Sequence, residues 1–545
     1  MPGVLAGGPG GAHARHVVIG PMVRTDPLGG SSLTRAVLDG GPARQWLDSP
    51  PASRAEWRRR ADETAARFAS RDWLGELRPA LAPSGQAARR LERVAAAGGV
   101  VVTTGQQPGL FGGPIYTWSK ALSALALADA LEEVAGIAAA PVFWAATDDS
   151  DFAEAKSTVI AVPGGVEVLE LTAAPEDEDR MMAAHPLAGV VPLLARLSRG
   201  AGAAVYPEAL EQARRAYDER ATVGGAFVAL LRAVLEPLGV AVLDAAHDAV
   251  RGAANPFLRD ALRAGDGIAR SLAQREDEIR ARGLSPQVAP VPGLSLVFRI
   301  ERGSRRRVRL TEAEGMAQRR DAVLSPNVLL RPLVEQEILP TVAYLGGPAE
   351  LGYFAQVSAV ARELSRPSPL AVPRWSGTIL EPHVMRILDR YGLPPEALHD
   401  PHAAESAIAR SSLPSSVRDR LAVIERAIDD LSGGLRGDPE ALALLPAPVV
   451  EGHRRELHRR LERLERRYVA SVKRRQADVA HELATARGAL YPRGVRQERA
   501  LNLLPLLARH GPELLARMRA RAGEHAIVLA AGAAVSTDSP AEAKR

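Results

Sequence analysis

Four carboxylates lie close together in one short segment of this chain. The sequence TDDSDFAE, which directly follows the hydrophobic run PVFWAA, contains Asp148, Asp149, Asp151 and Glu154. Carboxylates at this spacing repel one another unless they hold a cation, a substrate ammonium group or a shared proton. The structural alternative is an acidic helix N-terminus, in which Ser150 or Asp151 is the cap and Glu154 completes a capping box. The sequence leaves both interpretations open.

A glycine-rich turn, TGQQPGLFGGP, follows an earlier hydrophobic run, VVVTT. Glycines tolerate positive φ and allow a ligand to approach the backbone. The apolar spacing after the turn predicts a helix over residues 117–133 with Lys120 in its first turn. We therefore expect an anion site, the alternative being a solvated lysine beside a turn that serves only tight packing. The candidate binding residues of this segment are Gly105, Gln106, Gln107, Gly109, Gly113 and Tyr116.

A third group of candidate residues lies in the middle of the chain. Arg331 and Arg374 could clamp a carboxylate, because a guanidinium group matches a carboxylate with two parallel hydrogen bonds. For each arginine the alternative is a structural ion pair within the protein. The other candidates of this group are Asn327, Gly347 and Glu350.

The elements that must position these residues are parallel strands. Short hydrophobic runs predict strands over residues 100–104, 141–146, 240–244, 344–347 and 370–372. The first two strands and the helix between them form a βαβ unit, so both of its loops leave the carboxyl edge at which open α/β sheets bind ligands. The glycine-rich turn matches neither G-x-G-x-x-G nor G-x-x-x-x-G-K-[ST], and thus predicts neither a dinucleotide fingerprint nor a P-loop.

Composition indicates a large cytoplasmic enzyme. The chain has 545 residues, of which 46% are hydrophobic, and no apolar run approaches the roughly 20 residues that cross a bilayer. The start of the chain lacks the features of a signal peptide. The absence of cysteine excludes disulfides, a zinc-thiolate site and a cysteine nucleophile.

The net charge of +5 comes mainly from arginine clusters such as residues 305–307. Aromatic residues make up only 4% of the chain and are not interleaved with the basic runs, as a nucleic-acid stacking surface would require. We therefore expect no nucleic-acid and no membrane partner, and interpret the arginine clusters as solvated faces of helices.

The pattern along the chain predicts seven segments. Between Leu457 and Leu483, apolar residues spaced by threes and fours predict one long helix with a narrow apolar seam, a coiled-coil arm; the alternative is a helix packed on its own domain. The segments are a disordered leader (1–16), an N-terminal helical segment (17–97), the first part of an α/β core (98–275), an inserted subdomain with a strand hairpin (276–322), the second part of the core (323–436), the arm (437–488) and a C-terminal segment (489–545).

Four blocks of the chain resemble one known family. TGQQPGLFGGPIYTWSK followed by FWAATDDSDFAEA is similar to the core of the cysteine-adding enzymes of bacillithiol biosynthesis, the BshC family. Blocks at 325–356, 372–381 and 490–515 resemble further family motifs in the same order. Two positions depart from the family pattern: Ser150 replaces a histidine, and Glu335 replaces a glutamine.

The resemblance implies a Rossmann-like nucleotide-binding core similar to the class I synthetases, with an inserted subdomain and a C-terminal coiled coil through which the protein forms a homodimer. It also implies a ligase that joins the carboxyl group of cysteine to the amine of glucosaminyl malate. Because a free carboxylate must be activated, ATP with Mg²⁺ is the expected activator. The two departures keep open a related ligase or nucleotidyltransferase with another substrate, and a non-catalytic dimeric scaffold is a further alternative.

The resemblance assigns roles to the candidate residues. Lys120 and the glycine-rich turn would hold anionic oxygens. The three aspartates of the acidic loop would hold the substrate ammonium group or Mg²⁺, or accept a proton from the attacking amine. Arg331 and Arg374 would orient the malate carboxylates.

Overall fold

The computed structural model describes residues 20–172 and 180–531, so the predicted leader lies outside the described residues. Its centre is a five-stranded parallel sheet in the order β11-β10-β2-β3-β6. The five hydrophobic runs predicted as strands are these five strands. They are β2 (Val100–Gln106), β3 (Ala139–Ala145), β6 (Ala241–Asp244), β10 (Thr341–Gly346) and β11 (Ala371–Pro373).

Helices cover both faces of this sheet, which explains why its strands are continuously hydrophobic. Val100 and Val102 of β2 point into a core with α5 (Ile115–Ala135), and α5 in turn packs along α22 (Leu504–Ala530). Val101 points to the opposite face, because successive strand side chains alternate. The helices of that face include α3 (Trp73–Leu81), α10 (Asp248–Arg263), α13 (Arg331–Ile338) and α14 (Pro348–Glu363).

The strand order places a topological switch point beside β2. From β2 the chain proceeds to β3 and β6 on one side, and β10 and β11 later add on the other side. The loops after β2 and β10 therefore diverge at the carboxyl edge and leave a crevice, the position at which open α/β sheets bind ligands.

Three small antiparallel sheets surround the core. The predicted hairpin of the inserted subdomain is formed by β7 (Leu294–Glu301) and β8 (Ser304–Arg309), joined by β9 (Leu324–Pro326). A second hairpin consists of β4 (Ser157–Val162) and β5 (Gly165–Glu170). The sequence did not predict β1 (Met22–Thr25), which lies in the segment expected to be helical; it pairs with the distant β12 (Gly377–Leu380), and no local pattern reveals such a pairing.

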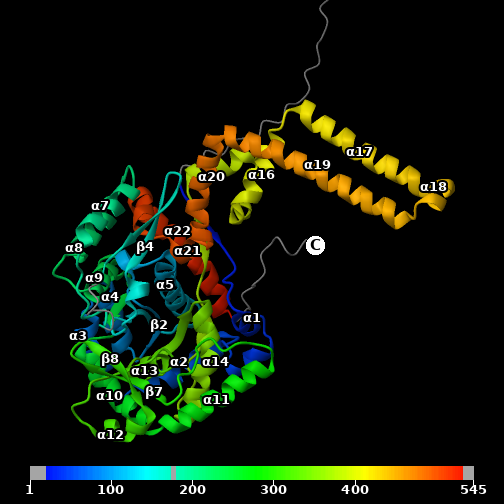
Figure 1. The fold of residues 1–545 in the computed structure, drawn as a ribbon. Coiled ribbons are helices and arrows are strands. Elements are labelled where there is room, and N and C mark those ends of the chain that lie inside the picture. Colours follow the sequence, from blue (N-terminus) through cyan, green and yellow to red (C-terminus); the bar gives the residue numbers. More distant parts are fainter. Residues whose placement is uncertain (1–19, 173–179, 532–545) are drawn as a thin grey trace, which may run out of the picture.

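A helical arm projects from the body of the molecule (Figure 1). It is a hairpin of α17 (Ser415–Gly437) and α19 (Ala447–Arg475), with α18 (Pro439–Leu444) at its tip. The prediction of one long helix is wrong, because Gln476 leaves the helical backbone (φ −110°, ψ 53°) and separates α19 from α20 (Ala477–Leu490). The sequence assigned α17 to the second part of the core, but α17 packs against α19.

The apolar seam of the arm divides into a covered and an uncovered part. Leu483 of α20 is buried in a small core with α15 (Pro382–Tyr391), whereas Leu457 and Leu464 of α19 are 46% and 41% exposed.

Among the described residues, no helix has the length and apolar character to span a bilayer. The remaining helices are α1 (Ser32–Leu38), α2 (Arg54–Ala66), α4 (Gly85–Ala96), α6 (Phe152–Ala155), α7 (Val190–Gly200), α8 (Glu208–Ala216), α9 (Val223–Leu235), α11 (Gly265–Ala281), α12 (Ala313–Gln318), α16 (Pro401–Ser411) and α21 (Gln497–Ala500).

Candidate active site

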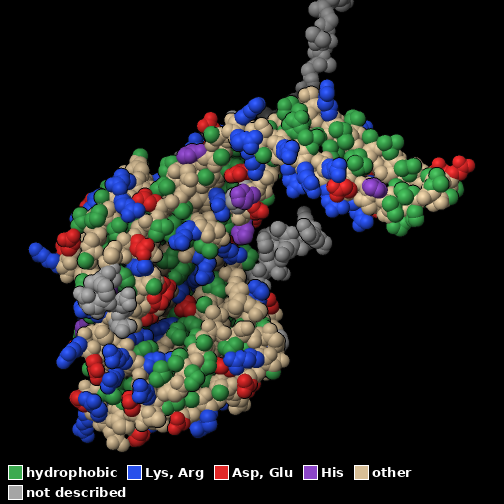
Figure 2. Space-filling model, in the orientation of Figure 1, with side chains coloured by type: hydrophobic (Ala, Val, Ile, Leu, Met, Phe, Trp, Pro, Cys, Tyr) green, Lys and Arg blue, Asp and Glu red, His purple; other side chains and the backbone are tan. Residues whose placement is uncertain are grey.

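A cavity of about 570 Å³ opens at the carboxyl edge of the central sheet; we call it the main cavity. Figure 2 shows charged side chains of both signs gathered in the hollow that crosses the body of the molecule. Fourteen of the sixteen residues predicted for the site line the main cavity. They are Gly105, Gln106, Gln107, Tyr116, Lys120, Asp148, Asp149, Asp151, Glu154, Asn327, Arg331, Gly347, Glu350 and Arg374.

The two remaining predicted residues shape the glycine-rich turn. Gly113 has a φ of +71°, and a Cβ atom on Gly109 would lie 2.7 Å from the Gly113 Cα atom. Tight packing therefore requires both glycines, as the structural alternative for this turn proposed. Gly109 lines a neighbouring cavity, whereas Gly113 lines neither of the two.

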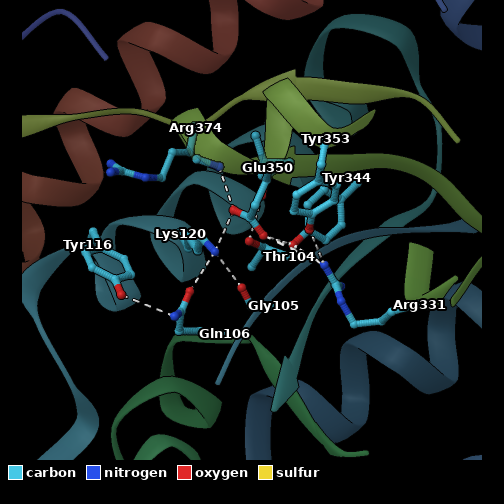
Figure 3. Close-up of polar contacts among 12 residues, drawn as sticks. Thr104, Gly105, Gln106, Tyr116, Lys120, Arg331, Tyr344, Glu350, Tyr353 and Arg374 are labelled. Carbon is cyan, nitrogen blue, oxygen red and sulfur yellow. Dashed lines mark hydrogen bonds and ion pairs between the residues drawn. The ribbon is translucent and has the colours of Figure 1, made fainter. Parts of the chain in front are cut away.

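The ammonium group of Lys120 contacts three groups of the protein. Its Nζ atom lies 2.6 Å from Glu350 Oε2 and donates hydrogen bonds to the Gly105 carbonyl (2.7 Å) and to Gln106 Oε1 (2.8 Å), as Figure 3 shows. An ammonium group has three hydrogens, so these partners satisfy it. Burial lowers the pKa of Lys120, while the adjacent Glu350 carboxylate opposes that shift.

Two predictions for Lys120 are therefore corrected. Helix α5 begins at Ile115, which places Lys120 in its second turn rather than in its first. The side chain is 5% exposed and paired with Glu350, so its charge is already neutralised within the protein. Because Gly105 lies near the end of β2 and Glu350 lies in the first turn of α14, Lys120 links the two segments that flank the switch point.

Arg331 is likewise engaged within the protein. Its guanidinium group donates to Glu335 Oε2 (2.7 Å), to the Tyr353 hydroxyl (2.9 Å) and to the Tyr344 hydroxyl (3.1 Å), and Figure 3 shows the two tyrosines around it. The predicted role of Arg331 as a clamp on a substrate carboxylate is not supported, because both of its terminal nitrogens already donate hydrogen bonds to Glu335 and the two tyrosines. Burial raises the pKa of Glu335 to about 7 although Arg331 opposes the shift.

Arg374 forms the predicted two-bond clamp, but with a residue of the protein. Its Nη1 and Nη2 atoms donate to the two carboxylate oxygens of Glu498 at 2.9 and 2.8 Å, and its side chain is 1% exposed. Burial alone would raise the pKa of Glu498, but the Arg374 guanidinium holds it below its usual value. The structural alternative is therefore correct for Arg374, and its expected role with malate is not supported.

The carboxylates of the acidic loop have two kinds of contact: one caps a helix, and two lie beside an arginine. Asp151 caps the short helix α6 by accepting a hydrogen bond from the Glu154 amide at 3.1 Å, as the structural alternative predicted. Asp148 and Asp149 lie 3.6 and 3.7 Å from the two terminal nitrogens of Arg305. In addition, Gln107 donates a hydrogen bond to the Asp149 carboxylate. Arg305 thus relieves the repulsion that the carboxylate spacing creates.

Two of these carboxylates have a raised pKa. Burial raises the pKa of Asp148, against the opposing charge of Arg305. Glu154 is an exposed residue, but partial desolvation of its carboxylate in the cavity wall raises its pKa, and Asp151 and Asp149 add to the shift. Among the described residues, no group of three or more His, Asp or Glu side chains is arranged to hold a metal ion.

The arginines of the β7–β8 hairpin were not among the predicted site residues. Residues 305–307 were predicted on a hairpin strand but were also interpreted as a solvated helix face; they lie on strand β8, and Arg305 and Arg307 line the main cavity. Both guanidinium groups lie near the Phe298 ring, at 4.1 and 5.7 Å from its centroid. Alternation along a strand places residues two apart on one face, and this was the signal that could have identified them.

Arg307 differs from the paired arginines of the site. It is half-buried, and no described residue forms a hydrogen bond or an ion pair with its side chain, including its buried Nε atom. Burial and the neighbouring Arg305 lower its pKa. The exposed Arg499 of α21 also lines the main cavity without such a partner in the described part of the chain. These arginines are the positive groups available to a ligand.

Comparisons with known proteins agree with this architecture. The family model "Bacillithiol biosynthesis BshC, N-terminal Rossmann-like domain" matches residues 44–375, and the model "Bacillithiol biosynthesis BshC, C-terminal coiled-coil domain" matches residues 377–526. They confirm the predicted Rossmann-like core with a C-terminal coiled coil.

Three relatives carry the name "Putative cysteine ligase BshC". The protein from Solibacter usitatus is 34% identical over 78% of this chain and 83% of its own length. That from Koribacter versatilis is 32% identical over 82% and 87%, and that from Bacillus licheniformis is 23% identical over 86% and 91%. The resemblance predicted from the sequence motifs is thus confirmed over most of the chain, and the protein belongs to the BshC family of bacillithiol biosynthesis.

Proposed function

We propose that this protein is a ligase that joins the carboxyl group of cysteine to the amine of glucosaminyl malate by an amide bond. The observation that carries the proposal is the main cavity: in a chain whose relatives are named as cysteine ligases, fourteen residues from the family-like blocks converge on one site. Its volume of about 570 Å³ lies in the range that small-molecule sites occupy.

ATP is part of the proposal, because amide formation from a free carboxylate requires activation. When bound, ATP supplies the leaving group that makes the carboxylate reactive. Arg307 fits the anionic oxygens of a nucleotide: it is half-buried beside Phe298 and its guanidinium group has no partner among the described residues. Arg305 remains with Asp148 and Asp149, so it fixes the acidic loop rather than a ligand.

Glu154 is the proposed proton acceptor. An attacking amine must lose a proton, and a carboxylate with a raised pKa accepts it more readily. Glu154 lines the cavity, its side chain accepts no hydrogen bond from the described residues, and its pKa is raised. Asp151 is less suited, since its carboxylate already caps α6. In this mechanism Lys120 and Glu350 are positioning residues that fix the loops after β2 and β10.

The two departures from the family pattern adjoin the main cavity but do not line it. Ser150 lies between the lining residues Asp149 and Asp151, and Glu335 is buried beneath Arg331. A substrate different from that of the family therefore gains no support from these two positions. The alternative of a non-catalytic scaffold does not explain why an unpaired arginine is kept half-buried at the cavity wall.

The test of this proposal is direct. Purified protein is incubated with glucosaminyl malate, cysteine and ATP, and the mixture is analysed by mass spectrometry for the amide product. We expect the product only when all three substrates are present. A product with another amine but none with glucosaminyl malate would instead support a related ligase.

A homodimer through the arm is a further part of the proposal. Helix α19 carries the exposed apolar side chains Leu457, Leu464 and Tyr468, and Figure 2 shows apolar side chains along the arm. A second copy that covers this face would remove it from water. Replacing Leu457 and Leu464 by lysine should yield a monomer in light scattering, because two charges would enter an apolar contact. An unchanged mass would place the dimer contact elsewhere.

A further inference from the structure

A second cavity, of about 410 Å³, adjoins the main cavity. Its walls include residues of the glycine-rich turn, of the start of α5, of β4 and of the segment before α21. The two cavities are neighbours with a common wall, which consists of Gln106, Gln107, Tyr116, Glu154 and Arg499. A molecule held in the second cavity therefore lies beside the main cavity.

Two arginines line the second cavity without partners. Neither Arg493 nor Arg499 forms a hydrogen bond or an ion pair through its side chain with any described residue. Arg499 is nevertheless firmly placed, since the preceding Glu498 and Gln497 are buried and bonded to the core. Arg493 has a φ of +54°, a backbone conformation that is uncommon outside glycine and that recurs at functional sites.

The start of helix α5 adds to the positive character of the second cavity. Pro114, Tyr116 and Thr117, at the N-terminal end of this 21-residue helix, form part of the wall. The helix dipole favours a negative charge at that end. The Thr117 hydroxyl is buried and has no hydrogen-bond partner among the described residues. Glu154 is the one carboxylate among the described lining residues, and it stands at the boundary with the main cavity.

We infer that the second cavity binds the two carboxylates of the amine-bearing substrate, which is the malate group if the proposed function is correct. Two guanidinium groups without partners match two carboxylates, each through a pair of hydrogen bonds. Arg493 and Arg499 thus take the task predicted for Arg331 and Arg374, whose terminal nitrogens already donate hydrogen bonds within the protein. A substrate anchored there would place its amine beside Glu154, in the common wall of the two cavities.

Arg493 is the informative residue for a test, because it lines the second cavity and not the main one. We would measure the binding of L-malate, and separately of ATP, to the full-length protein by titration calorimetry. Arg493→Gln should weaken malate binding about tenfold or more and leave ATP binding unchanged, because only the malate site loses a charged donor. The double variant Arg493→Gln/Arg499→Gln should abolish malate binding.

The matched control is Arg199→Gln, which removes an exposed arginine of α7 that lines neither cavity. It should bind malate as the wild type does, which separates the loss of a site from a general loss of positive charge. Arg493→Lys should retain part of the affinity, since it keeps the charge without the two-bond geometry. Thermal unfolding of each variant verifies that the fold is intact.

Three outcomes would overturn the inference: no malate binding by the wild type at millimolar concentration, equal binding by the wild type and the double variant, or a loss of ATP binding in Arg493→Gln with malate binding retained. The last result would assign the second cavity to nucleotide phosphates. Malate binding is measured without cysteine or ATP. Failure to form the amide product would therefore overturn the proposed function and leave this inference standing.

Discussion

Two sets of positive side chains in the main cavity have opposite surroundings. Lys120 and Arg331 are buried and paired with Glu350 and Glu335. Arg307, on the β7–β8 hairpin, lines the same cavity but has no partner among the described residues. A buried charge is stable only with a partner, so the paired set belongs to the architecture, whereas the unpaired side chain has donors free for a ligand. Proximity to a cavity therefore does not by itself identify a ligand-binding residue.

The strongest test of this distinction is Lys120→Met. The substitution leaves the Glu350 carboxylate buried without its closest cation, and we expect the free energy of unfolding to fall by roughly 3–5 kcal/mol. Denaturant unfolding followed by circular dichroism measures the change. The control is Lys156→Met, since Lys156 also lies 2.6 Å from a carboxylate, that of Glu170, but at the surface.

The surface pair should contribute only about 0–1 kcal/mol, because water screens it. Equal effects of Lys120→Met and Lys156→Met would contradict the architectural role of the buried pair. If Lys120→Met leaves the unfolding free energy unchanged but removes ATP binding, Lys120 contacts the ligand instead of stabilising the fold.

Glu154→Gln should have the next largest effect, on turnover rather than on stability. The proposed proton acceptor would be lost, and we expect kcat to fall about a hundredfold with little change in the unfolding free energy. In the wild type, kcat should rise with pH as Glu154 ionises. This rise should lie above the usual pH range of a glutamate, because partial desolvation and Asp151 raise the pKa of Glu154.

Asp151→Asn is the matched control for Glu154→Gln. Asparagine also caps helices, and the residue lines the same cavity, so kcat should remain close to that of the wild type. If Asp151→Asn lost as much activity as Glu154→Gln, the whole acidic loop rather than one carboxylate would be required.

Arg307→Gln tests whether the unpaired arginine binds a ligand. The loss of one charged donor to a bound anion should weaken ATP binding about tenfold, with a stability change within about 0.5 kcal/mol. Calorimetry with ATP measures the affinity. Arg306→Gln is the control, because the neighbouring Arg306 is exposed and lies outside the main cavity. Equal ATP affinity in both variants would exclude Arg307 from the nucleotide site.

Hydrophobic runs and family-like blocks were sufficient to predict the five strands of the sheet and fourteen residues of the main cavity. The local pattern also offered the cap at Asp151 as an alternative. It could not reveal which charges are paired, since Arg374 meets Glu498 across 124 positions of the chain and Arg305 meets Asp148 across 157. For this reason the sequence did not show that Lys120, Arg331 and Arg374 are already paired within the protein.

Glu335, which replaces the glutamine of the family pattern, should make the stability of the protein depend on pH. Its pKa of about 7 in the folded protein exceeds the ordinary value of 4.5, because the side chain is buried. Between these values the folded state holds a proton that the unfolded state has released, so stability decreases as pH rises from about 4.5 to about 7 and is then constant. Glu335→Gln removes this titration. In that pH window the unfolding free energy of the variant should therefore fall less steeply than that of the wild type, by about 1 kcal/mol per pH unit.

Denaturant unfolding of the wild type and Glu335→Gln at several pH values measures this difference. Asn would shorten the side chain, whereas Gln keeps its length, so Arg331 retains an acceptor and the cavity wall is preserved. Parallel stability curves for the two proteins would mean that Glu335 is ionised throughout this range. Arg331 would then neutralise Glu335 in the same way that Lys120 neutralises Glu350, and the paired set would contain two full ion pairs.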